Sequence, residues 1–238
     1  MENGGTRVIG MIGGVSWESS ALLYRLINQE TRKRLGGNSN ARSLMFTVDF
    51  AEIVALQHRG DWDSIAELLG GIGRRLESAG AECLMLCANA LHKVAPQVQS
   101  AIGIPLLHIG DATGHAIRNE RLKRVGLLGT RTTMEQPFLR DFLLEQHGIE
   151  TIVPDTEERS AIQHIIFEEL AQGLVLDTSR DKLVAIVEGL ERIGCEGIVL
   201  GCTELPLLFE GITEVSGLPL FNTTALFASY AVDWALRV

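Results

Sequence analysis

The chain has 238 residues, of which 46% are hydrophobic, and it carries a formal net charge of −9 at neutral pH. This size and composition exclude a disordered chain and are enough to bury the core of one large α/β domain or of two lobes. The acidic balance gives no basis for binding nucleic acid, because that requires Lys and Arg clusters that neutralise phosphates. No apolar run approaches the roughly 20 residues that span a bilayer, and residues 1–5 lack the charged and apolar regions of a signal peptide. We therefore expect a cytoplasmic protein that binds neither nucleic acid nor membrane.

Short apolar strands alternate with longer segments of helical period along the first half of the chain. A strand is predicted at 6–14, followed by a helix that Ser16 can cap. A strand at 43–50, a helix through 64–80 and a strand at 82–90 come next. This alternation of strand and helix predicts a mostly parallel sheet covered by helices.

The second half of the chain repeats the order of the first. Ala88 and Cys202 are 114 residues apart, and so are Pro105 and Pro219. The matched positions favour duplication over the general strand and helix rhythm that any two such halves share. We predict two pseudo-symmetric Rossmann-like lobes, residues 1–115 and 116–238, with the last helix (about 224–238) packing back on the first lobe.

The four cysteines are expected to stay reduced in the cytoplasm. Cys83 and Cys87 are four residues apart, as metal ligands can be, but they lie in a predicted strand, where side chains alternate between faces. No His or Cys pair completes a tetrahedral site, so we expect no metal. Cys83 and Cys195 are interpreted as small buried hydrophobic residues.

The segments that follow the predicted strands are rich in Gly, Ser, Thr and Asn. They read "GGVSW", "ANALH", "GTRTTM" and "GCTEL". Ligands bind beyond the carboxyl ends of parallel strands, and backbone N–H groups near helix N-termini attract carboxylates there. None of these segments is a dinucleotide-binding or Walker motif, so no nucleotide is indicated.

Several long motifs carry a resemblance to a known family. They include "IGMIGGVSWESSALLYRLIN", "LCANALHK", "GLLGTRTTMEQPFL", "IIFEELAQG" and "VLGCTELPLL". Through them nearly the whole chain resembles the aspartate/glutamate racemase family, and within it the broad-specificity amino-acid racemases. The resemblance implies a two-lobed fold with the active site between the lobes, a homodimer, and neither pyridoxal phosphate nor metal. It also implies two residues that face each other across the α-carbon of an amino acid.

The resemblance assigns site residues position by position. Cys202 matches the second catalytic cysteine, and Ala88 stands where the first acid or base is expected. A catalytic thiolate needs nearby N–H groups or cations that lower its pKa. The implied substrate-binding residues are Ser16, Gln57, Asn89, Ala90, Thr130, Thr132, Ile166 and Thr203.

The departures from the family pattern cluster on the implied site. Ala88 can neither accept nor donate a proton, and Ala90 lacks a hydroxyl. Asn222 and Phe227 stand where the family segment has Asp and His. Either the racemase mechanism or the substrate is therefore altered.

Four hypotheses follow from these departures. The chain is a racemase in which Cys202 acts on one face of the substrate and a water, Cys87 or His92 acts on the other. Alternatively it is a single-cysteine decarboxylase or isomerase, similar to the arylmalonate decarboxylases. Ala88 also fits an engineered knockout, and a degenerate protein that only binds its ligand remains the non-enzymatic alternative. We favour the racemase.

The expected ligand is an amino acid or a dicarboxylate. Arg42 and Arg131 are the candidates to bind a second carboxylate, and neither makes aspartate a secure substrate. Trp17 and Tyr24 lie off the apolar stripe of the first helix, which is consistent with a dimer.

Overall fold

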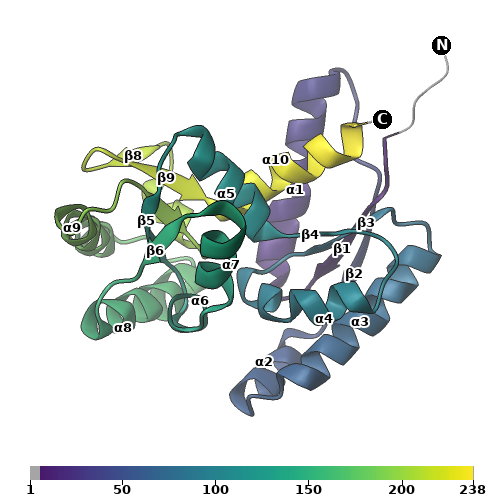
Figure 1. The fold of residues 1–238 in the computed structure, drawn as a ribbon, viewed down its shortest axis with the longest axis horizontal. Helices are drawn as coiled ribbons and strands as arrows, with labels where there is room; N and C mark the ends of the chain where they lie inside the picture. Colours follow the sequence, from purple (N-terminus) through teal and green to yellow (C-terminus); the bar gives the residue numbers. More distant parts are fainter. Residues whose placement is uncertain (1–5, 238) are drawn as a thin grey trace. The chain divides into compact units, whose positions relative to one another are not determined.

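A computed structural model describes residues 6–237 as an α/β protein with two mostly parallel sheets, each flanked by helices (Figure 1). The predicted fold class is confirmed. The chain divides into two compact units, the first made of Met1–His108 with Phe227–Val238 and the second of Ile109–Leu226. Residues 1–5, on which the signal-peptide argument rested, lie outside the described residues. Within residues 6–237, no helix is long and apolar enough to cross a membrane.

The first unit contains a four-stranded parallel sheet in the order β2-β1-β3-β4. Leu84 and Leu86 of β3 pack into one apolar core with Ile65 and Leu69 of α3. The elements are β1 (Ile9–Gly13), α1 (Trp17–Leu35), β2 (Ser43–Thr47), α2 (Phe50–His58), α3 (Trp62–Ser78), β3 (Cys83–Leu86), η1 (Asn89–Val94), α4 (Ala95–Ser100) and β4 (Leu106–Leu107).

The second unit repeats this order as β6-β5-β7-β9 and adds β8, which pairs antiparallel with β9 at the edge. Helices α8 and α9 cover one face of its sheet, and α5 and α7 cover the other. The elements are α5 (Ile109–Asn119), β5 (Arg124–Leu128), α6 (Arg131–Glu135), α7 (Phe138–His147), β6 (Glu150–Ile152), α8 (Thr156–His164), the π-helical turn η2 (Ile165–Glu169), η3 (Leu170–Gln172), α9 (Asp177–Arg192), β7 (Ile198–Leu200), η4 (Leu205–Phe209), β8 (Glu214–Val215) and β9 (Leu218–Asn222). The last helix, α10 (Thr223–Leu236), begins in the second unit and belongs to the first unit from Phe227 onward.

The four parallel strands of each sheet share one arrangement, in which their order across the sheet is second, first, third, fourth. Strand β3 therefore corresponds to β7, and the residues that follow them correspond as well. Ala88 packs on the same side as Leu84 and Leu86 of β3. Cys202 likewise packs on the same side as Ile198 and Leu200 of β7.

Several strands end earlier than the sequence suggests, in one case because a polar side chain caps the helix that follows. The strand predicted at 82–90 ends at Leu86. The strand predicted at 43–50 ends at Thr47, where Asp49 accepts a hydrogen bond from the Ala51 N–H. Such a cap satisfies an N–H group that has no partner within the helix.

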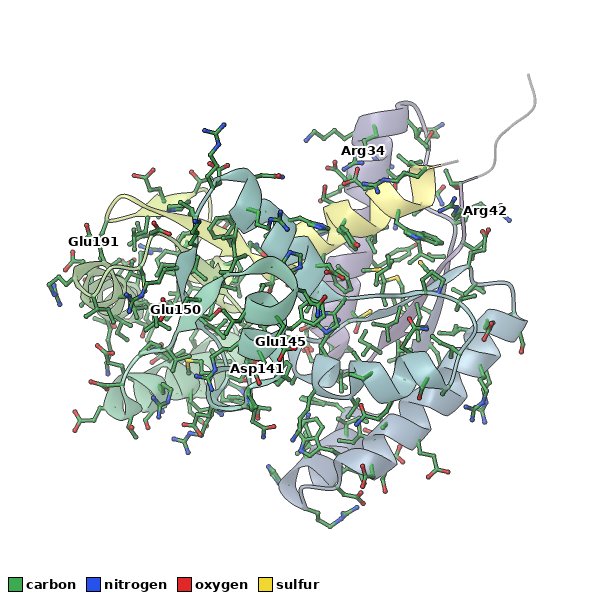
Figure 2. The ribbon with its side chains drawn as sticks, viewed as in Figure 1. Arg34, Arg42, Asp141, Glu145, Glu150 and Glu191 are labelled. Atoms are coloured by element: carbon green, nitrogen blue, oxygen red, sulfur yellow. The ribbon has the colours of Figure 1, made fainter. Side chains whose placement is uncertain are left out.

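Arg34 joins α1 to α10 within the first unit. Its guanidinium bonds to Glu30 on its own helix, to the Ser229 hydroxyl at 2.9 Å and to the Asp233 carboxylate. Figure 2 shows Arg34 in the last turn of α1, at the end of the unit where the strands begin. This end of the first unit is held by charged contacts, whereas the opposite end, where the strands finish, carries the loops of interest.

The loop between β1 and α1 depends on a glycine. Gly14 has φ +105°, and a Cβ there would lie 2.2 Å from the Val48 carbonyl oxygen. We predict that Gly14→Ala lowers the unfolding free energy by about 3 kcal/mol or more, since strain and a clash with backbone combine. Gly37→Ala is the control, because Gly37 has φ +57° with no atom near the added Cβ, and it should lose only about 1 kcal/mol. Equal losses in urea unfolding of the two variants would contradict the close approach at Val48.

Candidate active site

Each sheet reverses its strand order between its first and third strands. In the first unit β1 lies between β2 and β3, so the crossover connections leave it in opposite directions. Ligands of such sheets bind beyond the carboxyl ends of the two strands at this reversal. The reversal gathers Ser16, Ala88 and Asn89 in the first unit.

The same reversal occurs between β5 and β7 in the second unit. The backbone N–H of Gly201 donates to the Leu128 carbonyl oxygen at 2.7 Å, which holds the end of β7 against the end of β5. Thr130 and Thr132 follow β5, and Cys202 and Thr203 follow β7. Four of the predicted site residues therefore share this end of the second sheet.

Ser16 and Thr130 occupy equivalent positions as helix N-caps. The Ser16 hydroxyl accepts from the Ser19 N–H at 3.3 Å, and the Thr130 hydroxyl accepts from the Thr133 N–H at 3.4 Å. Ser20 closes the first loop by accepting from the Gly14 N–H and donating to the Ser16 carbonyl oxygen. Both hydroxyls are half-buried and already engaged as caps.

Ala88 lies two residues beyond the end of β3, and Asn89 and Ala90 begin η1. Ala88 has an extended backbone and is half-buried, whereas Asn89 is buried. Cys87 does not belong to the core that contains Ala88, as expected from strand alternation. Burial raises the pKa of the Cys87 thiol to about 12, so it holds no thiolate at neutral pH.

His92 is a buried structural residue of the first unit. Its Nδ1 lies 3.1 Å from the Ala88 carbonyl oxygen, and its ring meets His108 and Phe227 edge to face. Burial lowers the pKa of His92 to about 4, so the imidazole is neutral at physiological pH. As a neutral imidazole His92 offers no acidic proton to a substrate.

Asn222 and Phe227 also have structural roles. The Asn222 side chain accepts from the N–H groups of Thr224 and Ala225, both at 3.1 Å, and so caps α10. Phe227 is almost fully buried against His92. Asn222 keeps the helix cap that Asp would form, but without the negative charge. Phe227 places an apolar ring beside His92 where the family segment has a polar histidine.

Cys202 is the chemically distinctive residue of the second unit. It is 8% exposed, and its thiol donates to Oε2 of Glu204 at 2.9 Å. The Thr203 hydroxyl donates to the same carboxylate oxygen at 2.7 Å. Glu204 was not among the predicted site residues, although the quoted "GCTEL" motif contains it.

The pKa of the Cys202 thiol is raised well above its ordinary value. Burial is the largest cause, followed by the negative charge of Glu204, while the backbone N–H groups of Thr203 and Glu204 act in the opposite direction. A catalytic thiolate was expected to need a lowered pKa. Instead the resting form of Cys202 is the thiol, because burial and the neighbouring negative charge both disfavour the thiolate.

Ile166 and Gln57 are placed differently. Ile166 lies in the π-helical turn η2, buried in the same apolar core as Cys202. Such π-turns are frequent at functional sites. Gln57 is half-buried in the last turn of α2, about two helical turns beyond the end of β2.

Neither arginine proposed for a second carboxylate is a free cation at a strand end. Arg42 directly precedes β2, at the opposite end of the sheet from the loops, and Figure 2 shows it on the side where Arg34 lies. The expectation that Arg42 reaches the pocket is wrong for this reason. Arg131 does follow β5, but its guanidinium bonds to Ser160 at 3.1 Å and pairs with Glu135 at 3.6 Å.

The cysteines form no metal cluster. Cys83 and Cys195 are buried, as predicted. Between residues 6 and 237, no group of three or more His, Cys, Asp or Glu side chains is arranged to hold a metal ion.

Comparisons with known proteins agree on one family. Residues 12–231 match the profile described as Asp/Glu/hydantoin racemase. A Yersinia pestis protein described as a candidate Asp/Glu racemase is 47% identical, with a TM-score of 0.92 over 97% of this chain and all of that one. An aspartate racemase homologue from Pyrococcus horikoshii is 32% identical, with a TM-score of 0.86 over the same shares of the two chains.

A glutamate racemase from Shewanella loihica is 24% identical over 156 residues, which are 63% of this chain and 57% of that protein. Matches to the glutamate racemases of Actinobacillus pleuropneumoniae cover 48% of their length. The chain thus spans about half the length of the glutamate racemases that it matches.

The buried neutral His92 predicts a specific loss of stability in acid. Its pKa is lower in the folded protein than the unfolded value near 6.5, so between pH 6.5 and about 4 the unfolded chain binds a proton that the folded chain does not. Stability therefore falls as pH falls through this window, by roughly 3 kcal/mol from this residue.

The His92→Phe variant keeps an aromatic ring against His108 and Phe227, and the Ala88 carbonyl oxygen keeps its bond from the Leu91 N–H. Urea unfolding at pH 7 and pH 4.5 should show a smaller acid loss for this variant than for the parent protein. Parallel pH profiles of the two proteins would show that His92 is not buried in its neutral form.

Proposed function

Because the chain belongs to the Asp/Glu/hydantoin racemase family, we propose that it is a cofactor-independent amino-acid racemase in which Cys202 transfers the α-proton. The observation that carries the proposal is the position of Cys202. It follows β7 at the strand-order reversal of the second sheet, with its S–H directed to a carboxylate. A buried thiol with a defined proton acceptor is suited to moving a proton to and from carbon.

Removing the α-proton of an amino acid leaves charge on the substrate carboxylate, which becomes an enediolate. Donors that are already oriented toward this charge stabilise it without reorganisation. In our proposal the loop residues supply these donors through backbone N–H groups and through side chains. They are Ser16, Asn89, Thr130, Thr132 and Thr203, with Gln57, Ala90 and Ile166 lining the pocket.

Ala88 determines what Cys202 can do alone. Inversion requires proton removal on one face of the α-carbon and delivery on the other. Ala88 occupies the position equivalent to Cys202 and has no proton to deliver, while Cys87 and His92 are both neutral near pH 7. Of the three proton donors considered for the opposite face of the α-carbon, namely a water, Cys87 and His92, only the water remains. Exchange of the α-proton should therefore be faster than inversion.

A single-cysteine decarboxylase is the second candidate, and Ala88 is the observation that favours it. In such a reaction a carboxylate leaves as carbon dioxide, and one thiol protonates the resulting enediolate on one face. The resting thiol of Cys202 is the form required for this step. An inactive variant that only binds its ligand, natural or engineered at Ala88, would do neither reaction.

The proposal extends to the setting of the enzyme. A thiol that transfers protons has to stay reduced, which favours the cytoplasm. A homodimer is supported by an apolar groove between α1 and the edge strand β2, which exposes Trp17, Tyr24 and Met45. We propose no second carboxylate on the substrate, since Arg42 is remote and Arg131 is paired.

The first test is α-proton exchange in D2O, followed by NMR for a panel of L- and D-amino acids together with chiral chromatography. The parent protein should exchange the α-proton of at least one amino acid, and Cys202→Ala should reduce this rate by about 100-fold or more, because the proton-transferring group is gone. Cys195→Ala is the matched control, since Cys195 is a buried thiol outside the loops. Unchanged exchange in Cys202→Ala would remove Cys202 from the mechanism.

Replacing Ala88 tests the missing group on the other face. Ala88→Thr and Ala88→Cys each add a side chain that can carry a proton at the position equivalent to Cys202. Either variant should raise the ratio of inversion to exchange in the same NMR and chromatography assay. If exchange occurs but neither variant increases inversion, then Ala88 is not the residue that limits racemisation.

A further inference from the structure

The carboxylate of Glu204 has an unusual arrangement of hydrogen bonds. One oxygen, Oε2, accepts from both Sγ of Cys202 at 2.9 Å and Oγ1 of Thr203 at 2.7 Å. The bond from Thr203 fixes the carboxylate, and the bond from Cys202 fixes the direction of the thiol proton. Three consecutive residues thus form a short chain of polar contacts at the end of β7.

The contact between Cys202 and Glu204 differs from a surface ion pair because Cys202 is buried. Cys202 belongs to an apolar core that also contains Met134, Ile166 and Leu205. The charge that acts on its thiol is that of Glu204, and the other polar groups against it are backbone N–H groups of Thr203 and Glu204. Ionising the thiol here would place a second negative charge beside the first in a desolvated site.

We propose that Glu204 is the proton acceptor of Cys202, so that the pair shares one transferable proton and one negative charge. This inference deepens the proposed function and rests on it. Glu204 acts through Cys202 and is a positioning residue, because in this arrangement it touches the thiol and not the substrate.

The proton balance of the pair is simple. The S–H bond of Cys202 breaks and its proton forms an O–H bond on Oε2 of Glu204, which leaves a thiolate beside a neutral carboxyl group. The thiolate then takes the α-proton, so that an S–H bond forms and the electron pair of the C–H bond remains on the substrate. In the reverse direction the thiol protonates the carbanion and recovers its proton from Glu204. One negative charge moves from carboxylate to sulfur to substrate, and no oxidant or cofactor takes part.

This sharing explains how a thiol with a raised pKa can act as a base. Free thiolate beside a carboxylate would require two adjacent negative charges, whereas transfer within the pair keeps one. The backbone N–H groups of Thr203 and Glu204 stabilise the sulfur during the moment in which it carries the charge.

The experiment compares Glu204→Gln with the control Glu210→Gln, which removes a carboxylate from an exposed position at the end of η4. Two quantities are measured on each full-length protein. The first is α-proton exchange in D2O for an amino acid that the parent protein exchanges. The second is the rate at which iodoacetamide alkylates Cys202 as a function of pH, read from the Cys202 peptide by mass spectrometry, because all four cysteines are free.

Glu204→Gln should lower α-proton exchange by about 100-fold or more, since glutamine cannot accept the proton. The same variant should alkylate Cys202 faster at neutral pH, with the midpoint of thiol ionisation at lower pH, because the neighbouring negative charge is removed. Unfolding would also abolish exchange and expose the thiol, so alkylation of the buried Cys87 and Cys195 is read from the same digest and should stay as slow as in the parent protein. Glu204→Asp keeps a carboxylate and should retain more exchange than Glu204→Gln, and Glu210→Gln should match the parent protein in both assays.

Two results would overturn the inference while leaving the proposed function intact. One is full α-proton exchange in Glu204→Gln, and the other is an unchanged pH dependence of Cys202 alkylation in that variant. Absence of exchange in the parent protein for every amino acid tested would instead overturn the proposed function, and the role of Glu204 in that reaction would fall with it.

Discussion

Parallel pairing of the first and third strands within each sheet is the constraint on which the remaining structure depends. β1 pairs with both β2 and β3, and β5 pairs with both β6 and β7. In each sheet the second and third strands therefore lie on opposite sides of the first. No helix fills the space beyond the strand ends at this reversal, because the helices that follow the two strands leave toward opposite faces of the sheet. Small residues and helix caps therefore collect there, and the register that aligns Leu128 with Leu200 brings Cys202 to the same end.

The sequence predicted the elements and the duplicated architecture because these depend on local periodicity. Strand ends were predicted less well, since the cap formed by Asp49 competes with continued strand pairing. Arg42 was misplaced because its position relative to β2 decides which end of the sheet it occupies, and strand limits are uncertain by a few residues from sequence. Contacts that depend on side-chain direction, such as the bond from Cys202 to Glu204, have no sequence signal beyond the proximity of the two residues.

The substitutions that distinguish this chain from its family pattern share one physical consequence in the first unit. Ala88 has no polar side chain, Phe227 is an apolar ring, and His92 is held neutral between that ring and His108. Cys87 is likewise neutral. The ends of β1 and β3, from Gly14 to Ser16 and from Cys87 to His92, thus hold no group that changes its protonation near neutral pH.

The second unit has the opposite character, since the end of β7 holds a thiol and a carboxylate in direct contact. Burial disfavours charge on the Cys202 thiol, and the Glu204 carboxylate beside it accepts hydrogen bonds from one thiol and one hydroxyl. A base made of two groups can release and recover the same proton, so it does not need a partner on the other face for exchange. It does need one for inversion. In the proposed mechanism this difference between the two strand ends separates the two steps of racemisation, because the end of β7 holds the thiol and carboxylate for proton removal and Ala88 after β3 holds no proton to deliver.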